Sequence, residues 1–344
     1  MSKATAIAHP NLAFLKYWGK RDSTLNIPIN NSISMNLDAV QTVTTVEFNA
    51  AFANDEVVVL EQGGGGRARF DQRVSKHLDR LRSRAGSSLR ARVITRNSFP
   101  AGTGFASSAS GFAALTMAGS AALGLDLSER ELSILSRMGS GSASRSIPDG
   151  IVEWLAGDSS DTSYARQLVP PDYWQLIDVA VLVSAEEKKV SSSEGHELAM
   201  NSPFWPVRLE ALPGKYVRMS QAIHDRDFIT FGRELESEAM MMHTIMMTSA
   251  HMDGDAWRSG IYYWTGDTLA LVQAVQEWRA AGLQVYFTLD AGPTVHLICL
   301  ETDREAVVSA VNMLAEQSGR AHWSLTVNRP GLGARLTDAH LEAR

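Results

Sequence analysis

The sequence predicts an α+β fold divided into two domains, and three observations support this prediction. The chain has 344 residues, a length that commonly corresponds to two domains or to one large one. Hydrophobic residues make up 44% of it, enough to bury a sizeable core and to exclude a disordered or fibrous chain. Segments with strand and helix patterns are mixed, and strands recur in pairs, which favours α+β over a doubly wound sheet.

The first half of the chain is expected to alternate strands with helices. Residues 43–48 and 89–95 are rich in β-branched side chains, which predicts strands. Residues 111–123 are small, apolar and free of proline, which predicts a buried helix. The almost continuous apolar run 176–183 predicts a buried strand, and a polar stretch follows it.

The second half again mixes the two types of element. Helices are expected at 209–223, 228–247, 268–281 and 304–316. Strands are expected at 283–289, 294–300 and 323–327. Because the polar stretch after the first buried strand marks a change of unit, we expect a first domain at 1–184 and a second at 185–344.

Charge and cysteine content exclude several classes of protein. Lys and Arg total 32 against 38 Asp and Glu, a net charge of −6, whereas nucleic-acid binders usually show a basic excess. A single cysteine, Cys299, precludes an intrachain disulfide and a cysteine-based zinc site. No apolar stretch reaches the roughly 18 residues of a membrane span, and no signal peptide is evident. We therefore expect a cytoplasmic protein without nucleic-acid or membrane partners.

A glycine- and serine-rich run at 99–111 suits a phosphate group. Glycines let the backbone approach an anion closely, and Ser107 and Ser108 add hydroxyl donors. The helix that follows presents free N–H groups and the positive end of its dipole. A loop whose serine merely caps the helix would have the same composition, so both interpretations stay open.

Two further runs carry cations beside hydroxyls or aromatic rings. In 139–146, four serine hydroxyls accompany Arg145, whose planar fork suits a carboxylate or a phosphate. In 8–22, Lys16 and Lys20 accompany a tyrosine and other aromatic residues. These cations suit an anionic tail, although a solvated charged loop fits the second run equally well.

A fourth run, 288–293, places an Asp-Ala-Gly-Pro turn between two expected strands. Such a turn can be purely structural. A carboxylate at the end of a buried strand, here Asp290, can also be catalytic. The residues alone leave both alternatives open.

Taken together, the four runs resemble the GHMP small-molecule kinase superfamily and, within it, the mevalonate diphosphate decarboxylase branch. The superfamily's phosphate loop, Pro-x-x-x-Gly-x-x-Ser-Ser-Ala, is matched by residues 100–109. The His-Pro-Asn…Lys-Tyr-Trp-Gly-Lys-Arg-Asp, Gly-Ser-Gly-Ser-Ala-x-Arg-Ser and Asp-Ala-Gly-Pro motifs are typical of the decarboxylase branch. The resemblance covers residues 6–333. It implies a ribosomal protein S5 domain 2-like N-terminal domain, a ferredoxin-like C-terminal domain and an active site in the cleft between them.

The resemblance also implies an activity, that of an ATP-dependent carboxy-lyase in isoprenoid biosynthesis. ATP and Mg²⁺ would serve to phosphorylate the tertiary 3-hydroxyl of a 5-phosphorylated mevalonate, after which phosphate and CO₂ leave. The phosphorylation makes chemical sense because phosphate is a much better leaving group than a tertiary hydroxyl. Members of this branch are expected to be homodimers.

By resemblance, Asp290 lies beside the 3-hydroxyl as base or orienting carboxylate, Arg145 grips the substrate carboxylate and holds Asp290, and Lys16 stabilises the transferring phosphoryl group. The 5-phosphate tail would contact Tyr17, Lys20, Arg73, Ser140, Ser142 and Ile147. The ATP phosphates would contact Gly102, Gly104, Ala106, Ser107, Ser108, Lys188, Ser191 and Ser192. Mg²⁺ would contact Ser107 or Ser108. His243, on an expected helix, would not take part and would be a satisfied core histidine.

One departure from the family pattern bears on the substrate. Many diphosphate-using members have an aromatic residue and two glycines after Arg-Ser-Leu, whereas this chain has Ile147, Pro148 and Asp149. An added carboxylate near a multiply charged tail disfavours binding through Coulomb repulsion. We therefore expect mevalonate 5-phosphate as substrate and isopentenyl phosphate as product. The alternative is mevalonate 5-diphosphate giving isopentenyl diphosphate; further alternatives are a mevalonate 3-kinase and a non-catalytic nucleotide-binding protein.

Overall fold

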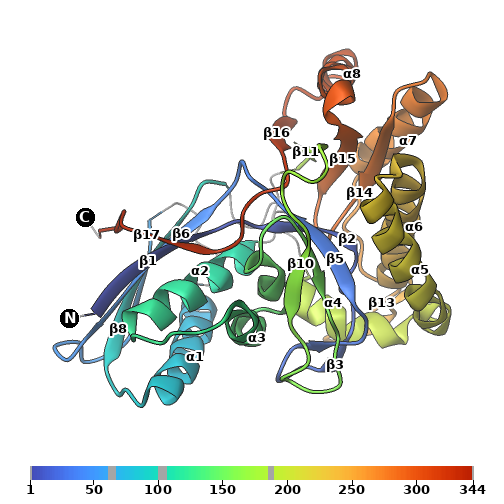
Figure 1. The fold of residues 1–344 in the computed structure, drawn as a ribbon. Coiled ribbons are helices and arrows are strands. Elements are labelled where there is room, and N and C mark those ends of the chain that lie inside the picture. The colour runs from blue at the N-terminus through green and yellow to red at the C-terminus, as the bar shows by residue number, and fades with distance from the viewer. Residues whose placement is uncertain (1, 61–66, 100–106, 185–189, 343–344) are drawn as a thin grey trace.

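The computed structural model describes residues 2–60, 67–99, 107–184 and 190–342, and it has the α+β architecture that the sequence predicts. Three sheets of four or five strands and two short hairpins make up the strands of these residues. Figure 1 shows that both chain ends lie beside the same sheet. Among the described helices, none is long and apolar enough to cross a membrane.

A five-stranded sheet lies next to the chain ends. Its strands, in spatial order, are β17 (Arg335–Thr337), β1 (Ser2–Ala8), β6 (Thr42–Asn49), β8 (Arg90–Asn97) and β7 (Glu56–Val59). The helices on this side are α1 (Arg67–Ala85), α2 (Ser107–Ala122) and α3 (Glu129–Gly139). Small residues dominate α2, so it packs closely across β1 and β6 and its serine-rich start is fixed in place.

A four-stranded sheet forms the middle of the molecule. Its strands, in spatial order, are β10 (Ala165–Val169), β9 (Ile151–Trp154), β5 (Ser32–Asn36) and β2 (Asn11–Leu15). β2 and β5 are buried along their whole length because they contact two layers. These layers are the short helix η1 (Gly141–Ser146) and the long helices α5 (Trp205–Asp225) and α6 (Phe228–Thr248). A hairpin of β3 (Lys20–Asp22) and β4 (Ile27–Pro28) follows β2.

The third sheet is antiparallel and belongs mainly to the second half of the chain. Its strands, in spatial order, are β14 (Val285–Thr288), β15 (Thr294–Leu300), β11 (Leu176–Leu182) and β16 (Ser324–Asn328). One face forms a core with α5 and α6, and the other with α7 (Gly266–Ala280) and α8 (Arg304–Gln317). Cover on both faces explains the nearly continuous apolar run of β11. Its one charged residue, Asp178, is buried and bonded to His296 (3.0 Å) and Asn328 (3.1 Å).

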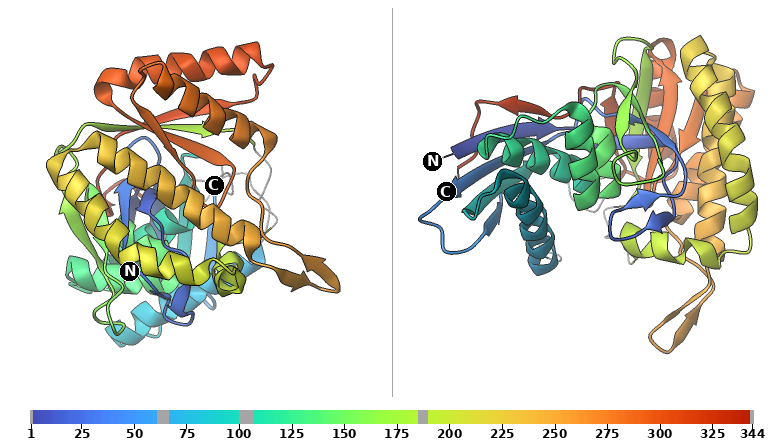
Figure 2. Two further views of the ribbon diagram at one scale, coloured as in Figure 1. Left: turned by 90° about the vertical axis from the view of Figure 1, so that its right-hand side faces the viewer. Right: turned by 60° about the horizontal axis from the view of Figure 1, so that its bottom comes forward.

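The remaining elements connect these layers: α4 (Ser192–Leu198), η2 (Ala199–Asn201), β12 (His251–Asp253), β13 (Ala256–Arg258) and η3 (Glu301–Asp303). Figure 2 shows the hairpin of β12 and β13 extending away from the body of the molecule. Cys299 is a free, buried thiol on β15, in agreement with its apolar sequence context.

The expected division into 1–184 and 185–344 differs from the way the strands pair. β11 was expected in the first domain, but it pairs with β15 and β16 in the sheet of the second half. β17 was expected in the second domain, but it pairs with β1, with Thr337 opposite Thr5. Composition shifts mark local changes along the chain, whereas these pairings join segments that are far apart in sequence.

Candidate active site

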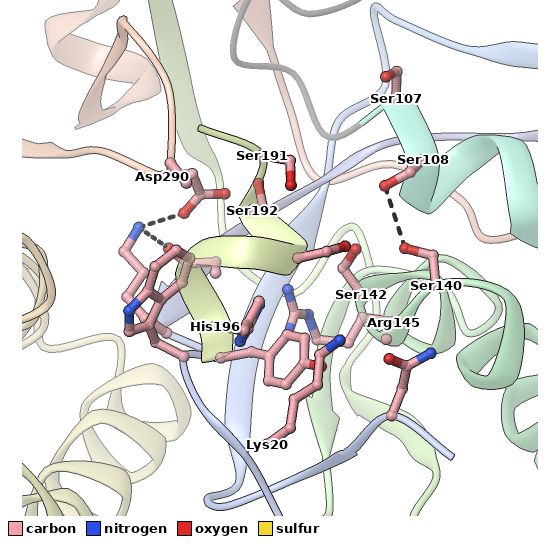
Figure 3. A pocket seen from close by; sticks show the side chains of 18 of the residues that line it. Lys20, Ser107, Ser108, Ser140, Ser142, Arg145, Ser191, Ser192, His196 and Asp290 are labelled. Carbon is pink, nitrogen blue, oxygen red and sulfur yellow. Dashed lines mark hydrogen bonds and ion pairs between the residues drawn. The ribbon is translucent and has the colours of Figure 1, made fainter. Parts of the chain in front are cut away.

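One cavity of about 310 Å³ brings together the candidate residues from all four sequence runs. It lies where the ends of β2 and η1, the starts of α2 and α4, and the β14–β15 turn converge (Figure 3). The candidates that line it are Lys16, Tyr17, Lys20, Arg73, Ser107, Ser108, Ser140, Ser142, Arg145, Ser191, Ser192 and Asp290. Four are cations and one is a carboxylate, so the cavity suits an anionic ligand.

The innermost feature is an ion pair between Lys16 and Asp290. Lys16 follows β2 directly and is 1% exposed, and Asp290 lies in the turn after β14. The Lys16 ammonium donates to Asp290 Oδ1 and to the carbonyl oxygen of Ala13, both at 2.7 Å. Figure 3 shows one carboxylate oxygen of Asp290 bonded to the Lys16 ammonium and the other directed away from it, toward the side of the cavity where Ser192 lies.

The two members of this pair shift each other's protonation. Burial raises the pKa of Asp290, but the charge and hydrogen bond of Lys16 outweigh burial, so the pKa lies below its ordinary value. Burial lowers the pKa of Lys16 more than Asp290 and Glu238 raise it. Asp290 is therefore ionised at neutral pH and able to accept a hydrogen bond or proton from a hydroxyl in the cavity.

Arg145 is held by two neighbours that the sequence did not single out. Its Nε donates to Asn11 Oδ1 at 3.1 Å and its Nη1 to Ser32 Oγ at 2.8 Å. Asn11 is fixed in turn by donating to the carbonyl of Ser142 and the hydroxyl of Ser146. Burial lowers the pKa of Arg145 to about 10, which leaves the guanidinium charged at neutral pH.

By resemblance, Arg145 is expected to contact Asp290 directly, but the observed hydrogen bonds differ. Asp290 bonds to Lys16, whereas Arg145 acts on Asp290 through its charge. Asn11 belongs to the His-Pro-Asn run and Ser32 to an Asn-Asn-Ser run. Polar residues in strands that are otherwise buried were the signal that could have identified both, because a buried polar group needs a partner.

The serines lie at three element ends around one side of the cavity. Ser107 and Ser108 form the first turn of α2, and Ser108 Oγ lies 3.2 Å from Ser140 Oγ. Ser191 is the N-cap of α4, with its hydroxyl accepting from the backbone N–H of Glu194. The other expected phosphate contacts, at Gly102, Gly104, Ala106 and Lys188, lie outside the described residues.

Aromatic rings and two further cations complete the lining of the cavity. Tyr17 packs on His196, with ring centroids 4.2 Å apart, and its hydroxyl approaches Gly141 so closely that a Cβ there would lie 2.6 Å away. Arg73 donates to the carbonyl of Gly139 at 3.0 Å. His196, which the sequence analysis missed, accepts at Nδ1 from the backbone N–H of Gly19, so its Nε2 carries the proton.

Two expectations for the segment after Arg145 are wrong. Ile147 is 4% exposed and packs in the core of the first half, so it is not a substrate contact. Asp149 Oδ1 accepts from the backbone N–H of Gly333 at 2.6 Å and does not line the cavity. The reason is the chain direction, because η1 ends at Ser146 and the following residues run toward the C-terminal segment.

His243 on α6 is a core residue, as expected, but neither ring nitrogen has a hydrogen-bond partner among the described residues, so it is not the satisfied histidine that was expected. It is 1% exposed and packs against the ring of Trp264, with centroids 5.3 Å apart. Burial, with the charge of Lys16, lowers its pKa to about 3, so the imidazole is neutral at physiological pH. His243 therefore adds no charge to the Lys16–Asp290 pair.

Comparison with known proteins agrees with this geometry. A diphosphomevalonate decarboxylase-like N-terminal domain matches residues 8–165, and a mevalonate 5-diphosphate decarboxylase C-terminal domain matches residues 179–332. Diphosphomevalonate decarboxylase of Aspergillus fumigatus is 34% identical, covering 91% of this chain and 80% of the relative. Phosphomevalonate decarboxylase of Haloferax volcanii is 32% identical, covering 90% of this chain and 92% of the relative.

Solved structures extend the comparison to three dimensions. Mevalonate diphosphate decarboxylase from Staphylococcus aureus superposes with a TM-score of 0.87 at 32% identity, covering 98% of both chains. A structure described as being in complex with MVAPP, AMPPCP and magnesium has a TM-score of 0.85 at 33% identity, covering 97% of this chain and 98% of the other. The chain belongs to the diphosphomevalonate decarboxylase family.

Proposed function

We propose that this protein is an ATP-dependent decarboxylase that converts mevalonate 5-diphosphate into isopentenyl diphosphate. The observation that carries the proposal is the ion pair between the buried Lys16 and the partly exposed Asp290, beside Arg145, in a cavity with a net excess of cations. A 5-phosphorylated mevalonate has a partner for each feature of this site: its hydroxyl for Asp290, its carboxylate for Arg145 and its phosphorylated tail for the remaining cations. The Aspergillus fumigatus relative is named diphosphomevalonate decarboxylase, and the Staphylococcus aureus structure is that of a mevalonate diphosphate decarboxylase. Both names support mevalonate 5-diphosphate as the substrate.

The position of Asp149 gives no support for a monophosphate substrate. That expectation depended on the Asp149 carboxylate lying near the substrate tail, whereas that carboxylate bonds to the Gly333 backbone. The cavity instead offers the cations Lys20 and Arg73 for the tail, with the Tyr17 side chain beside them. One observation still favours the monophosphate as second candidate, namely the Haloferax volcanii relative named phosphomevalonate decarboxylase.

In the proposed reaction, the ionised Asp290 accepts a hydrogen bond from the 3-hydroxyl and takes up its proton as the γ-phosphoryl group is transferred. Lys16 stabilises the charge on the phosphoryl group. The C3–O bond then breaks and its electron pair leaves with phosphate. The bond to the carboxylate, oriented by Arg145, breaks next, and its electrons form the new double bond as CO₂ departs.

ATP is assigned to the serine side of the cavity. Ser107, Ser108, Ser191 and Ser192 supply hydroxyls there, and the expected contacts of Gly102, Gly104, Ala106 and Lys188 remain predictions. Within the described residues, no group of three or more His, Cys, Asp or Glu side chains is arranged to hold a metal ion. This fits Mg²⁺ bound mainly through the nucleotide phosphates and water, with Ser107 or Ser108 as protein ligand. Bound Mg²⁺ neutralises charge on the phosphates.

The test is a direct comparison of substrates. Purified protein receives ATP and Mg²⁺ with either mevalonate 5-diphosphate or mevalonate 5-phosphate, and kcat/KM is measured from CO₂ and ADP release. We expect stoichiometric release of both products and a clear preference for the diphosphate. A preference for the monophosphate would reverse the substrate assignment, ADP without CO₂ would identify a kinase, and neither product would indicate a non-catalytic protein. Light scattering of the same sample tests whether the protein is the homodimer expected for its family.

A further inference from the structure

A second ion pair lies directly behind the catalytic candidates and is completely buried. Arg208 on α5 and Glu238 on α6 both have 0% exposed side chains, and Arg208 Nη2 lies 2.7 Å from Glu238 Oε1. Neither residue lines the cavity. The pair therefore does not contact a ligand there, and its position needs another explanation.

The same two atoms of this pair also bond to the main chain of Lys16. The backbone N–H of Lys16 donates to Glu238 Oε1 at 3.3 Å, and its carbonyl accepts from Arg208 Nη2 at 3.3 Å. Asn30 Nδ2 also donates to this carbonyl, at 3.0 Å. Since β2 ends at Leu15, the buried peptide groups of Lys16 have left the strand ladder and need partners elsewhere.

We propose, on the basis of the proposed function, that Glu238 and Arg208 are positioning residues that hold the Lys16 main chain so that its ammonium stays directed at Asp290. The pair comes from two helices of the second half, whereas Lys16 comes from the first. Asp290 also belongs to the second half. The Arg208–Glu238 pair therefore fixes the position of Lys16 relative to Asp290 across the junction of the two halves.

A purely stabilising role explains this pair poorly. Burying two charges has a large desolvation cost, and apolar side chains of similar size often give equal or greater stability. Arg208 Nε and Nη1 and Glu238 Oε2 also have no hydrogen-bond partner among the described residues. Contact with Lys16 gives a reason for charged groups at this place.

The pair also bears on the charge of Lys16. The groups that act on the Lys16 ammonium are Asp290, Glu238, Arg145 and the neutral His243, with Arg208 behind its main chain. Glu238 raises the pKa of Lys16 and so opposes the effect of burial. Loss of the Glu238 charge should therefore make Lys16 lose its proton at lower pH.

The experiment compares two identical substitutions on one helix. Glu238→Gln removes the charge next to Lys16, whereas Glu236→Gln removes a charge that pairs with Arg279 at 2.7 Å and has no contact with Lys16. We expect Glu238→Gln to lower kcat about tenfold or more, because misplacing a catalytic group costs rate, with KM for ATP nearly unchanged. The alkaline limb of its pH profile should move to lower pH. Glu236→Gln should keep kcat within about twofold of the unaltered protein and leave its pH profile unchanged.

Because Glu238→Gln leaves Arg208 without a counter-charge, a second variant carries Arg208→Met and Glu238→Leu together. An apolar pair should fold, but it cannot bond to the Lys16 main chain. We expect reduced kcat and, in a crystal structure, Lys16 Nζ beyond hydrogen-bond distance of Asp290. The proposal is overturned if either folded variant has the kcat and pH profile of Glu236→Gln. It is also overturned if the Lys16–Asp290 pair is undisturbed in the crystal structure of the double variant. Failure of both variants to fold while Glu236→Gln folds overturns it as well.

The crystal structure separates this proposal from the proposed function. If the unaltered protein turned over neither mevalonate substrate, the proposed function would fail. The position of Lys16 in the double variant would still report whether Glu238 and Arg208 hold it.

Discussion

The inner wall and the rim of the cavity use cations in different ways. On the inner wall, Lys16 and Arg145 are 1% and 3% exposed, and each has named partners in the protein. On the rim, Lys20 is half-buried and Arg73 is exposed. Buried charges interact strongly with each other and with a reacting group, whereas exposed charges are screened by water. We infer that the inner wall performs the chemistry and that the rim selects and holds the anionic tail.

The largest effect is expected from the inner carboxylate. Asp290→Asn keeps the shape of the side chain but removes the base, so we expect kcat for CO₂ release to fall about 1000-fold. ATP affinity, measured by calorimetry, should change little because Asp290 is assigned to the 3-hydroxyl of the substrate and not to the nucleotide. Full activity in this variant would remove Asp290 from the mechanism and break the distinction between inner wall and rim.

Arg145→Lys should have the next largest effect. A lysine keeps the charge but cannot bond to both Asn11 and Ser32 while also presenting a planar fork. We expect kcat/KM to fall about 100-fold, since the substrate carboxylate would be misplaced. Measured rates within a few-fold of the unaltered protein would mean that charge alone suffices at this position.

Substitution on the rim should affect binding rather than turnover. Lys20→Met removes one cation from the proposed tail site, and we expect KM for the mevalonate substrate to rise about tenfold with kcat nearly unchanged. Steady-state kinetics at saturating ATP separates the two constants. A large fall in kcat instead would place Lys20 with the inner wall.

The pH profile should report the inner pair. The pKa of Lys16 lies below its ordinary value of 10.5, so kcat should fall on the alkaline side before that pH. No limb is expected from His243, whose pKa is about 3 rather than 6.5. Asp290 has a folded-state pKa below 3.8, so its contribution to stability is present above that pH and is lost as the pH falls through the folded value. Rates and thermal melting measured across pH test both statements.

The smallest effect is expected at Asp149, outside the cavity. Asp149→Asn removes the charge but keeps an oxygen that can accept from the Gly333 backbone N–H. We expect the ratio of kcat/KM for the diphosphate and monophosphate substrates to stay within about twofold. A clear rise in the preference for the diphosphate would show that this carboxylate acts on the tail after all.

Much of the fold could be predicted because local pattern reflects burial. The expected strand 43–48 became β6, and the expected helix 228–247 became α6. The pairing of β17 with β1 was not predicted, because three residues with no strong pattern form the last strand. Long-range pairing of such a short segment is decided by the surface that it meets rather than by its own composition.

The kinds of chemical group available to the site, and the family to which they belong, could be predicted from the residues alone. Glycines, serines, cations and one Asp-Ala-Gly-Pro turn were sufficient, because an anion site needs those groups whatever surrounds it. Which of these groups face one another depends on how the chain folds. Arg145 and Ile147 are two residues apart, yet one lines the cavity and the other lies in the core. Side-chain direction depends on local backbone turns and on packing, so the supports of Lys16 and Arg145 appeared only once the chain was folded.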